Sequence, residues 1–388
     1  MLPRIAFDSV THFYLRGSLT TKGLYYFVSY IPILKFEKFT TALIIAQDIQ
    51  SNNFSGDVDR VKIIFYALRE YDELIYCHEM KEKYGINFTY TTEYPNDKNI
   101  SLASGCDGMS CTPCDMSAKV LKAFHDAGVK YILTRSIGYD HVDLSAAREL
   151  GMKVDNVTYT PTGVADYAIM LMLASVRRFA HILKRTELQD YSLKNKLGRD
   201  FSQCTVGVMG TGKIGGTVIK HLSGFGCRIL AYDVYEKESV KEFASYVDLD
   251  TILKESDIIT LHMNANDANY HIINENSIAK MKEGAYIINT ARGKLIDSEA
   301  LIKGIESGKL GGAALDVLEF ENGLYYYDLM GEVMINHKLA ILRSFPNVIL
   351  SPHTAFYTAE DVREMVEGNF KSCYEFGTGK KLHGFEMK

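Results

Sequence analysis

The chain has 388 residues, which predicts two domains with a remainder because domains average about 150 residues. Hydrophobic residues make up 47% and charged residues 23%, an ordinary globular composition that excludes a disordered or fibrous protein. The net charge is −5, so the chain lacks the basic excess typical of nucleic-acid-binding proteins, and we expect no nucleic-acid partner.

Neither a membrane span nor a disulfide framework is expected. No apolar run reaches the roughly 18 residues that a membrane helix needs. Seven cysteines are an odd count for a disulfide framework, and a chain of this length can bury a core without disulfides. We therefore expect a cytoplasmic protein without a membrane partner.

The first 60 residues differ from the remainder. They are rich in aromatic and β-branched residues, show no alternation of strands and helices, and end in a polar stretch at residues 51–60. We expect residues 1–60 to be an extension: either the upstream translation of a wrongly assigned start or a poorly ordered segment.

Regular patterning begins at Val61. The apolar runs predict strands at residues 61–68, 86–93 and 130–136, with helices over 72–84 and near 117–127. The Thr160-Pro161-Thr162 sequence predicts the start of one long, largely buried helix that runs through Leu183.

After Phe201, six short apolar runs alternate with segments of helix length. The runs are CTVGVMG, RILAYD, DIITLHM, AYIINTARG, GAALDVL and NVILSPH. This alternation indicates βαβ units and a parallel sheet buried on both faces. The predicted fold class is α/β, with doubly wound parallel sheets of the Rossmann or flavodoxin kind.

Each of these runs has, at or near its end, a residue of a type that often binds ligands or takes part in catalysis. In an open α/β sheet, ligands bind beyond the carboxyl ends of the strands. The residues at those ends are Gly210, Asp233, His262, Arg292, Asp316 and His353.

The first of these ends carries a dinucleotide-binding pattern. Gly210 and Gly212 would allow a tight turn and close approach to a pyrophosphate, and Gly215 would let the next helix pack on the strand. Asp233, 23 residues after Gly210, would accept hydrogen bonds from the adenine ribose hydroxyls and repel a 2′-phosphate. The pattern predicts NAD rather than NADP; the alternative is a glycine-rich turn that binds nothing.

Arg292, Glu321 and His353 suit the reduction of a carbonyl group. Hydride addition needs a proton donor for the developing alkoxide, and a histidine held by a nearby carboxylate can supply the proton. An arginine fork suits a substrate carboxylate and can polarise the adjacent carbonyl. The alternative for each residue alone is a surface or capping role.

Several segments resemble the NAD-dependent D-isomer-specific 2-hydroxyacid dehydrogenases, and within them the D-lactate dehydrogenases, especially the vancomycin-resistance type. They are TVGVMGTGKIGG, YIINTARGKLID, GGAALDVLE, NVILSPHTAFYT, AGVKYILTRSIGYDHVDL and VADYAIMLMLASVRR. The resemblance covers residues 61–388. It implies a substrate-binding domain of residues 61–157 plus 355–388, an NAD-binding Rossmann domain of residues 158–354, an active site in the cleft between them, and a homodimer.

The resemblance also implies residue roles. His353 would be the general acid and base, Glu321 its partner, and Arg292 the residue that holds the substrate carboxylate. Asp316 would bind the nicotinamide carboxamide, and we place His262 with the cofactor-binding residues. Further dinucleotide contacts would come from Lys213, Ile214, Thr290 and Ala291. The substrate carboxylate would meet backbone amides around Ile137, Gly138 and Tyr139, and the pocket walls would include Phe356, Tyr357 and the region of Cys111.

The expected reaction is the NADH-dependent, reversible reduction of a small 2-oxo acid to the D-2-hydroxy acid, with pyruvate as the first choice of substrate. One alternative keeps the chemistry and changes the substrate to a bulkier acid such as 2-oxoisocaproate or phenylpyruvate. Another is an NAD(H)-sensing corepressor, a class that resembles the same family and keeps its Arg, Glu and His.

Cys106, Cys111 and Cys114 raise the question of a metal site, since Cys-x-x-Cys is a ligand spacing. No second Cys or His pair follows at the distance typical of a zinc finger. We expect no metal, and we expect these thiols to line the substrate pocket.

Overall fold

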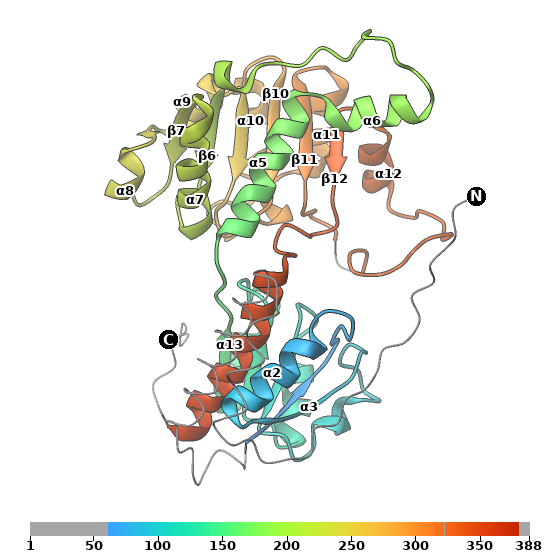
Figure 1. Cartoon of the computed structure of the whole chain (residues 1–388), viewed down its shortest axis with the longest axis vertical. Coiled ribbons are helices and arrows are strands. Elements are labelled where there is room, and N and C mark those ends of the chain that lie inside the picture. The colour runs from blue at the N-terminus through green and yellow to red at the C-terminus, as the bar shows by residue number, and fades with distance from the viewer. Residues whose placement is uncertain (1–60, 322, 380–388) are drawn as a thin grey trace, which may run out of the picture. The chain divides into compact units, whose positions relative to one another are not determined.

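A computed structural model of the chain describes residues 61–321 and 323–379 (Figure 1). The predicted extension, residues 1–60, lies outside the described residues. Among the residues that are described, no helix is long and apolar enough to cross a bilayer.

The first sheet has five parallel strands. They are β1 (Lys62–Phe65), β2 (Asn87–Tyr90), β3 (Gly108–Cys111), β4 (Tyr131–Thr134) and β5 (Lys153–Asn156). Their spatial order is β2-β1-β3-β4-β5, the flavodoxin-like doubly wound order, in which the chain direction across the sheet reverses at β1 and β3.

The helices of this first lobe come from two distant parts of the chain. They are α2 (Leu74–Tyr84), the 3₁₀ helix η4 (Ile100–Ala103), α3 (Ala118–Asp126), α4 (Leu144–Glu149) and α13 (Ala359–Thr378). Figure 1 shows α13, in red, beside α2, in blue. α13 buries Phe370 against Phe65 of β1, with ring centroids 5.4 Å apart, and stacks Phe376 on Tyr131 of β4 at 4.2 Å.

The second sheet has seven parallel strands. They are β6 (Thr205–Met209), β7 (Arg228–Tyr232), β8 (Ser245–Tyr246), β9 (Ile258–Leu261), β10 (Ala285–Asn289), β11 (Leu310–Leu315) and β12 (Val348–Leu350). The order is β12-β11-β10-β9-β6-β7-β8, so the strand order reverses between β6 and β9 as in a Rossmann sheet. Both sheets confirm the predicted doubly wound α/β class.

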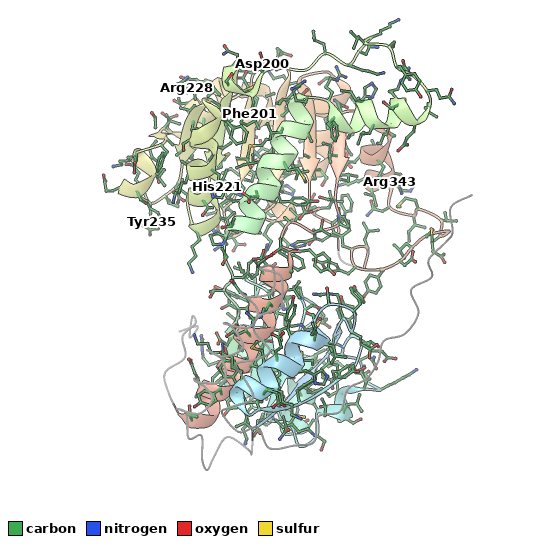
Figure 2. All side chains as sticks on the ribbon, in the orientation of Figure 1. Asp200, Phe201, His221, Arg228, Tyr235 and Arg343 are labelled. Carbon is green, nitrogen blue, oxygen red and sulfur yellow. The ribbon has the colours of Figure 1, made fainter. Side chains whose placement is uncertain are left out.

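Helices cover both faces of the second sheet. They are α5 (Thr162–Val176), α6 (Phe179–Glu187), α7 (Lys213–Leu222), α8 (Glu238–Lys241), α9 (Leu249–Glu255), α10 (Glu275–Lys280), α11 (Ser298–Glu306) and α12 (His337–Ser344), with 3₁₀ helices η5 (Phe201–Gln203), η6 (Ser223–Phe225) and η7 (Gly293–Leu295). α5 and α7 lie side by side, and Nδ1 of His221 on α7 is 2.7 Å from Oδ1 of Asp166 on α5 (Figure 2).

The prediction of one helix from Thr162 through Leu183 is wrong. α5 ends at Val176, Arg178 adopts a left-handed conformation (φ 52°), and α6 then begins at Phe179. α5 buries eight residues, whereas α6 buries none, so the helix breaks where the buried core ends. Three strands were not predicted from the apolar runs: β3, the polar strand β5 and the two-residue strand β8.

Candidate active site

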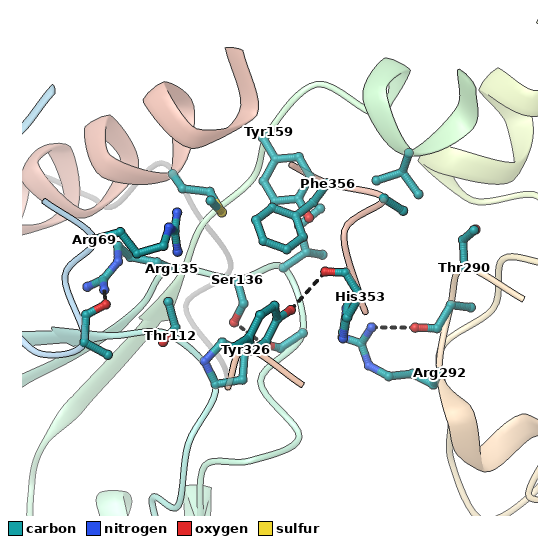
Figure 3. Close-up of a pocket in the computed structure, with 18 of the residues that line it drawn as sticks. Arg69, Thr112, Arg135, Ser136, Tyr159, Thr290, Arg292, Tyr326, His353 and Phe356 are labelled. Atoms are coloured by element: carbon teal, nitrogen blue, oxygen red, sulfur yellow. Dashed lines mark hydrogen bonds between the residues drawn. The ribbon is translucent and has the colours of Figure 1, made fainter. Parts of the chain in front are cut away.

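A cavity of about 460 Å³ collects the chain segments that follow the strands of both sheets (Figure 3). From the first lobe it takes Arg69, Thr92, Thr112, Arg135 and Tyr159, which follow β1 to β5 in turn. From the second lobe it takes residues after β9, β10 and β12, among them His262, Arg292 and His353. Carboxyl ends of parallel strands are the usual ligand site of such sheets, and here both sheets supply residues to one cavity.

The turn after β6 is built for close approach of a ligand to the backbone. A Cβ on Gly210, which has φ 91°, would lie 2.6 Å from Met263 N, and a Cβ on Gly215 would lie 1.9 Å from Gly210 O. A Cβ on Gly212 would meet nothing within 4 Å. Gly210 and Gly215 are therefore required by packing, and the open space at Gly212, directly before α7 begins, fits a pyrophosphate at a helix N-terminus.

Asp233 closes over this turn from the end of β7. Its Oδ2 accepts hydrogen bonds from Thr211 N at 2.5 Å and from Thr211 Oγ1 at 3.1 Å. Oδ1 accepts one from Tyr235 N at 3.2 Å, and the Tyr235 side chain is exposed (Figure 2). The partly exposed carboxylate thus lies at the first glycine of the turn, where a ribose hydroxyl needs an acceptor.

His262 follows β9 and lines the cavity. Its Nε2 is 2.8 Å from Thr260 Oγ1, whereas its Nδ1 is buried without a hydrogen-bond partner among the described residues. Burial lowers the pKa of His262 to about 3, so the ring is neutral at neutral pH. An unpartnered nitrogen beside the cavity fits a polar group of a bound cofactor.

His353 and Glu321 form a hydrogen-bonded pair. His353 Nδ1 is 2.9 Å from Glu321 Oε1, and Glu321 Oε2 accepts a bond from Leu318 N at 2.8 Å. The two side chains are 25% and 24% exposed, and His353 lines the cavity. His353 also has a left-handed backbone (φ 54°), which is rare outside glycine.

Asp316 organises the turn that carries His353. Its buried carboxylate accepts hydrogen bonds from Ser351 Oγ at 2.6 Å and from the backbone N of Thr354 and Ala355, each at 2.9 Å. Its carbonyl oxygen accepts a bond from His353 N at 2.8 Å. Asp316 is not among the residues that line the cavity, so the contact with a carboxamide implied by the resemblance stays a prediction.

Arg292 lies against the loop after β4. Its Nε is 3.3 Å from Asp140 Oδ1, and a Cβ on Gly138 would lie only 1.5 Å from its Nη2. Partial burial raises the pKa of the Asp140 carboxyl, but Arg292, a backbone hydrogen bond and His141 together hold that pKa below its ordinary value. Only glycine at position 138 leaves room for the guanidinium.

The other predicted residues divide into two groups. Ile137, Gly138, Phe356, Ile214, Thr290 and Ala291 line the cavity. Tyr139, Tyr357 and Lys213 are not among its lining residues, and the Tyr357 hydroxyl donates instead to Asp72 Oδ2.

The expectation of pocket-lining thiols is not supported. Cys111 is fully buried and Cys114 packs against the same core, while the two residues between them, Thr112 and Pro113, line the cavity. β3 ends at Cys111 with its side chain on the core face, so the next two residues reach the cavity instead. The described residues contain no group of three potential metal ligands, and every cysteine in them is free.

Sequence reasoning missed a buried ion pair at the far end of the cavity. Arg135 is completely buried, and its Nε donates to Glu73 Oε1 at 2.9 Å; its Nη atoms donate to Ser110 Oγ and to the carbonyl oxygens of Tyr66 and Ala67. Figure 3 shows Arg135 beside Arg69. Both arginines lie at or near the end of a predicted strand, and that position is the signal of them that the sequence offers.

Five aromatic side chains line the cavity: Tyr71, Tyr94, Tyr159, Tyr326 and Phe356. Only Phe356 was predicted. Figure 3 shows Tyr326 next to His353 and places Tyr159 beside Phe356.

Comparison with known proteins agrees with this geometry. Residues 169–355 match the D-isomer specific 2-hydroxyacid dehydrogenase, NAD binding domain. The chain is 43% identical to an aromatic 2-oxoacid reductase of Clostridium sporogenes over 81% of this chain and 96% of the relative. It is 37% identical to a D-lactate dehydrogenase of Lactiplantibacillus plantarum over 82% of this chain and 98% of the relative.

Solved structures show the same fold. A D-2-hydroxyisocaproate dehydrogenase is 34% identical, with a TM-score of 0.75 over 84% of this chain and 99% of the other. An NAD-complexed D-isomer specific 2-hydroxyacid dehydrogenase of Lactobacillus delbrueckii is 29% identical, with a TM-score of 0.74 over the same shares. The resemblance read from the sequence is confirmed: the chain belongs to the D-isomer specific 2-hydroxyacid dehydrogenases, a family of NAD-dependent oxidoreductases.

Proposed function

We propose that this chain reduces a 2-oxo acid with a bulky side chain to the D-2-hydroxy acid, reversibly. The observation that carries the proposal is the convergence of Arg292 and the His353–Glu321 pair on one cavity, beside the segments of a dinucleotide-binding sheet. NADH, when bound, would supply the hydride.

The dinucleotide is held along the carboxyl edge of the second sheet. The amides at the start of α7 would hold the pyrophosphate, and Asp233 would accept hydrogen bonds from the ribose. The full set of proposed contacts is Gly210, Gly212, Lys213, Ile214, Gly215, Asp233, His262, Thr290, Ala291 and Asp316. Gly212 and the unpartnered Nδ1 of His262 support this set from the structure itself.

The substrate carboxylate would be held by residues from both lobes. Arg292 approaches from β10, and the loop at Ile137, Gly138 and Tyr139 offers backbone amides from β4. A guanidinium binds a carboxylate through two parallel hydrogen bonds, which also fixes the direction of the adjacent carbonyl. Asp140 keeps the Arg292 guanidinium beside this loop.

His353 gives the proton in reduction and takes it in oxidation. Glu321 accepts the hydrogen bond of Nδ1, so Nε2 is left to face the substrate oxygen. Asp316 fixes the backbone on either side of the histidine, so the ring is held before substrate arrives.

The cavity supports a larger substrate than pyruvate, which the sequence placed first. Its walls include Tyr94, Tyr159, Tyr326 and Phe356, and the position nearest Cys111 is occupied by the small Thr112. Flat and branched side chains, as in phenylpyruvate and 2-oxoisocaproate, suit walls of this kind. The relative named as an aromatic 2-oxoacid reductase supports the same choice.

The test is NADH oxidation with pyruvate, 2-oxobutyrate, 2-oxoisocaproate and phenylpyruvate, with NADPH as the matched cofactor control. We expect kcat/KM for phenylpyruvate or 2-oxoisocaproate to exceed that for pyruvate by about 10-fold or more. A preference for pyruvate would overturn the substrate and keep the chemistry. NADH binding without turnover of any 2-oxo acid would overturn the chemistry and bring the corepressor alternative forward.

We propose that residues 61–157 with 355–379 form the substrate lobe and residues 158–354 the NAD-binding lobe. Each of the two sheets has its own buried core, which supports this division. We also propose a homodimer formed through the NAD-binding lobe. We further propose a cytoplasmic location, which the free cysteines support because free thiols are typical of a reducing compartment.

A further inference from the structure

We propose that Tyr326 positions His353 and determines which substrate side chains are accepted. This inference rests on the proposed function and adds a residue to it that neither the sequence motifs nor the comparisons assign. Tyr326 lies in the segment between β11 and β12, five residues after Glu321.

Tyr326 has a backbone conformation that is sterically unfavourable for a residue with a bulky side chain. Its φ is 71°, in the left-handed region where a bulky aromatic residue is a rare outlier. Such backbone conformations persist only where surrounding contacts enforce them, and they concentrate at functional sites. Two contacts of Tyr326, a hydrogen bond and a ring contact, are made with His353.

One of these contacts fixes the backbone of His353. Tyr326 Oη donates a hydrogen bond to His353 O at 3.1 Å, drawn in Figure 3. His353 has a left-handed backbone as well, with its N bonded to Asp316 O at 2.8 Å and its Nδ1 to Glu321 at 2.9 Å. The hydroxyl of Tyr326 thus holds the one backbone polar atom of His353 that these other two residues leave free.

The phenol stays a donor over the range in which the enzyme would work. Burial raises the pKa of Tyr326, and the carboxylates of Glu321 and Asp316 raise it further. Its hydrogen bond to the His353 carbonyl is therefore kept at neutral and mildly basic pH.

The ring of Tyr326 also forms a wall of the cavity. Its centroid is 6.0 Å from that of His353 with an interplanar angle of 32°, and Phe356 stands on another side of the imidazole at 6.3 Å and 79°. Tyr326 is still 49% exposed. A flat substrate side chain beside His353 would therefore cover apolar ring surface that the protein itself leaves open to solvent.

Tyr327 provides a matched control in the same segment. Its ring is tilted against Tyr94 with centroids 5.9 Å apart, it is not among the cavity-lining residues, and its hydroxyl makes no recorded hydrogen bond with a described residue. Tyr327→Phe removes a phenolic hydroxyl, as Tyr326→Phe does, but it leaves the hydrogen bond to His353 in place.

The hydrogen bond is tested with Tyr326→Phe, which keeps the ring. We expect kcat to fall by about 2- to 10-fold for pyruvate and phenylpyruvate alike, with KM within about twofold of wild type, as for the loss of one hydrogen bond. The Kd for NADH, the melting temperature and the Tyr327→Phe control should stay at wild-type values. An unchanged kcat, or a loss that Tyr327→Phe reproduces, overturns the positioning role.

The wall is tested with Tyr326→Leu, which removes the aromatic ring. We expect KM for phenylpyruvate to rise by about 10-fold while KM for pyruvate changes by less than about twofold, because only the larger side chain reaches the ring. Equal changes for both acids overturn the specificity role. A wild-type enzyme that turns over no 2-oxo acid would overturn the proposed function. A wild-type enzyme that is active and insensitive to the Tyr326 substitutions would overturn only the inference about Tyr326.

Discussion

At the scale of single residues, His353 is fixed by bonds to its backbone and to its ring before any substrate binds. His353→Gln keeps a polar side chain but cannot exchange a proton. We expect kcat for 2-oxo acid reduction to fall by about 10²- to 10⁴-fold, the usual contribution of a general acid. The Kd for NADH should stay within a few-fold of wild type, and a kcat near the wild-type value would exclude His353 as the acid.

Gly138 is a second residue whose identity the geometry dictates. A methyl group there would displace the Arg292 guanidinium, because the Cβ would lie 1.5 Å from Nη2. We expect Gly138→Ala to raise KM for 2-oxo acids by about 10-fold or more, through the misplaced carboxylate clamp. Gly224→Ala is the control, since a Cβ there meets nothing within 4 Å, and it should leave the steady-state kinetics unchanged. Equal effects of the two substitutions would contradict this reading.

We expect Asp233 to determine the preference between the two nicotinamide cofactors. Replacement by alanine removes the charge that would repel a 2′-phosphate, so the ratio of kcat/KM for NADH over NADPH should fall by about 10-fold. The same change frees Thr211 N and Thr211 Oγ1, so part of the NADH affinity should be lost as well. A ratio equal to that of wild type would show that another group discriminates.

At the scale of elements, the starts of α5 and α13 meet at Asp361. The side chain is 1% exposed, its Oδ2 has no hydrogen-bond partner among the described residues, and a Cβ on Gly163 of α5 would lie 2.5 Å from that oxygen. Burial raises the pKa of Asp361 to about 6, although Thr358 lowers it in part. The carboxylate is thus charged at neutral pH in a place that disfavours charge.

This raised pKa makes the protein's stability depend on pH in a defined direction. Because the folded-state pKa lies above the ordinary 3.8, the folded protein binds the proton more tightly, and the resulting stability is present below about pH 4 and lost as the pH rises through about 6. Asp361→Asn is neutral throughout. We expect it to be more stable than wild type near pH 7, by at most about 3 kcal/mol, with the difference vanishing near pH 4.

Thermal or urea unfolding of both proteins across this pH range measures the effect. Asp361 is joined on its own helix by Glu360 and Glu364, which also raise its pKa. Glu360→Gln is therefore a useful control and should give a smaller change of the same sign. A wild-type protein more stable than Asp361→Asn near pH 7 would contradict the prediction.

The sequence predicts elements well where a buried sheet imposes its own pattern. The apolar strands of the second sheet and the polar residues that end them, from Gly210 to His353, follow from spacing alone because a strand covered on both faces must be continuously apolar. Polar strands such as β5 give no such signal. The break before α6 is also hidden, since apolar residues resume at Phe179 after Arg177 and Arg178, although α6 buries none of them.

The candidate site was less predictable on the side of the first lobe. Arg69 and Arg135 follow predicted strands, but a single arginine at a strand end has no distinctive neighbours in the sequence. Tyr326 and Asp361 could not be found from the sequence at all. Their importance comes from backbone conformation and from contacts between segments, neither of which a residue's type or spacing records.

At the scale of the whole molecule, α6 and the stretch after it present an apolar surface to solvent. No residue of α6 is buried, and the exposed side chains are Phe179, Leu183, Leu188, Tyr191, Leu193 and Leu197. A cluster of exposed apolar side chains in one segment is typical of a protein–protein interface. A second copy of the chain is the occupant that the proposed homodimer requires.

The dimer can be tested by sedimentation. We expect the wild-type protein to sediment as a dimer, and Leu193→Glu combined with Leu197→Glu to shift it toward the monomer by placing charges in the interface. Leu102→Glu introduces a charge at an exposed leucine of the other lobe and should have no effect. A wild-type monomer at micromolar concentration would exclude the proposed interface.

The packing of α13 on the first sheet determines the order in which the two lobes can be completed during synthesis. Lys83 and Glu367, which bond across α2 and α13, are 284 residues apart, so a ribosome completes the whole second sheet before it delivers α13. Until then the apolar face formed by Ile63, Phe65 and Leu133 is covered by α2 but not by Phe370 and Phe376 of α13. Domains generally fold as units during synthesis. The lobe that is begun first is therefore finished last, and part of its apolar core stays open to solvent until α13 has been made.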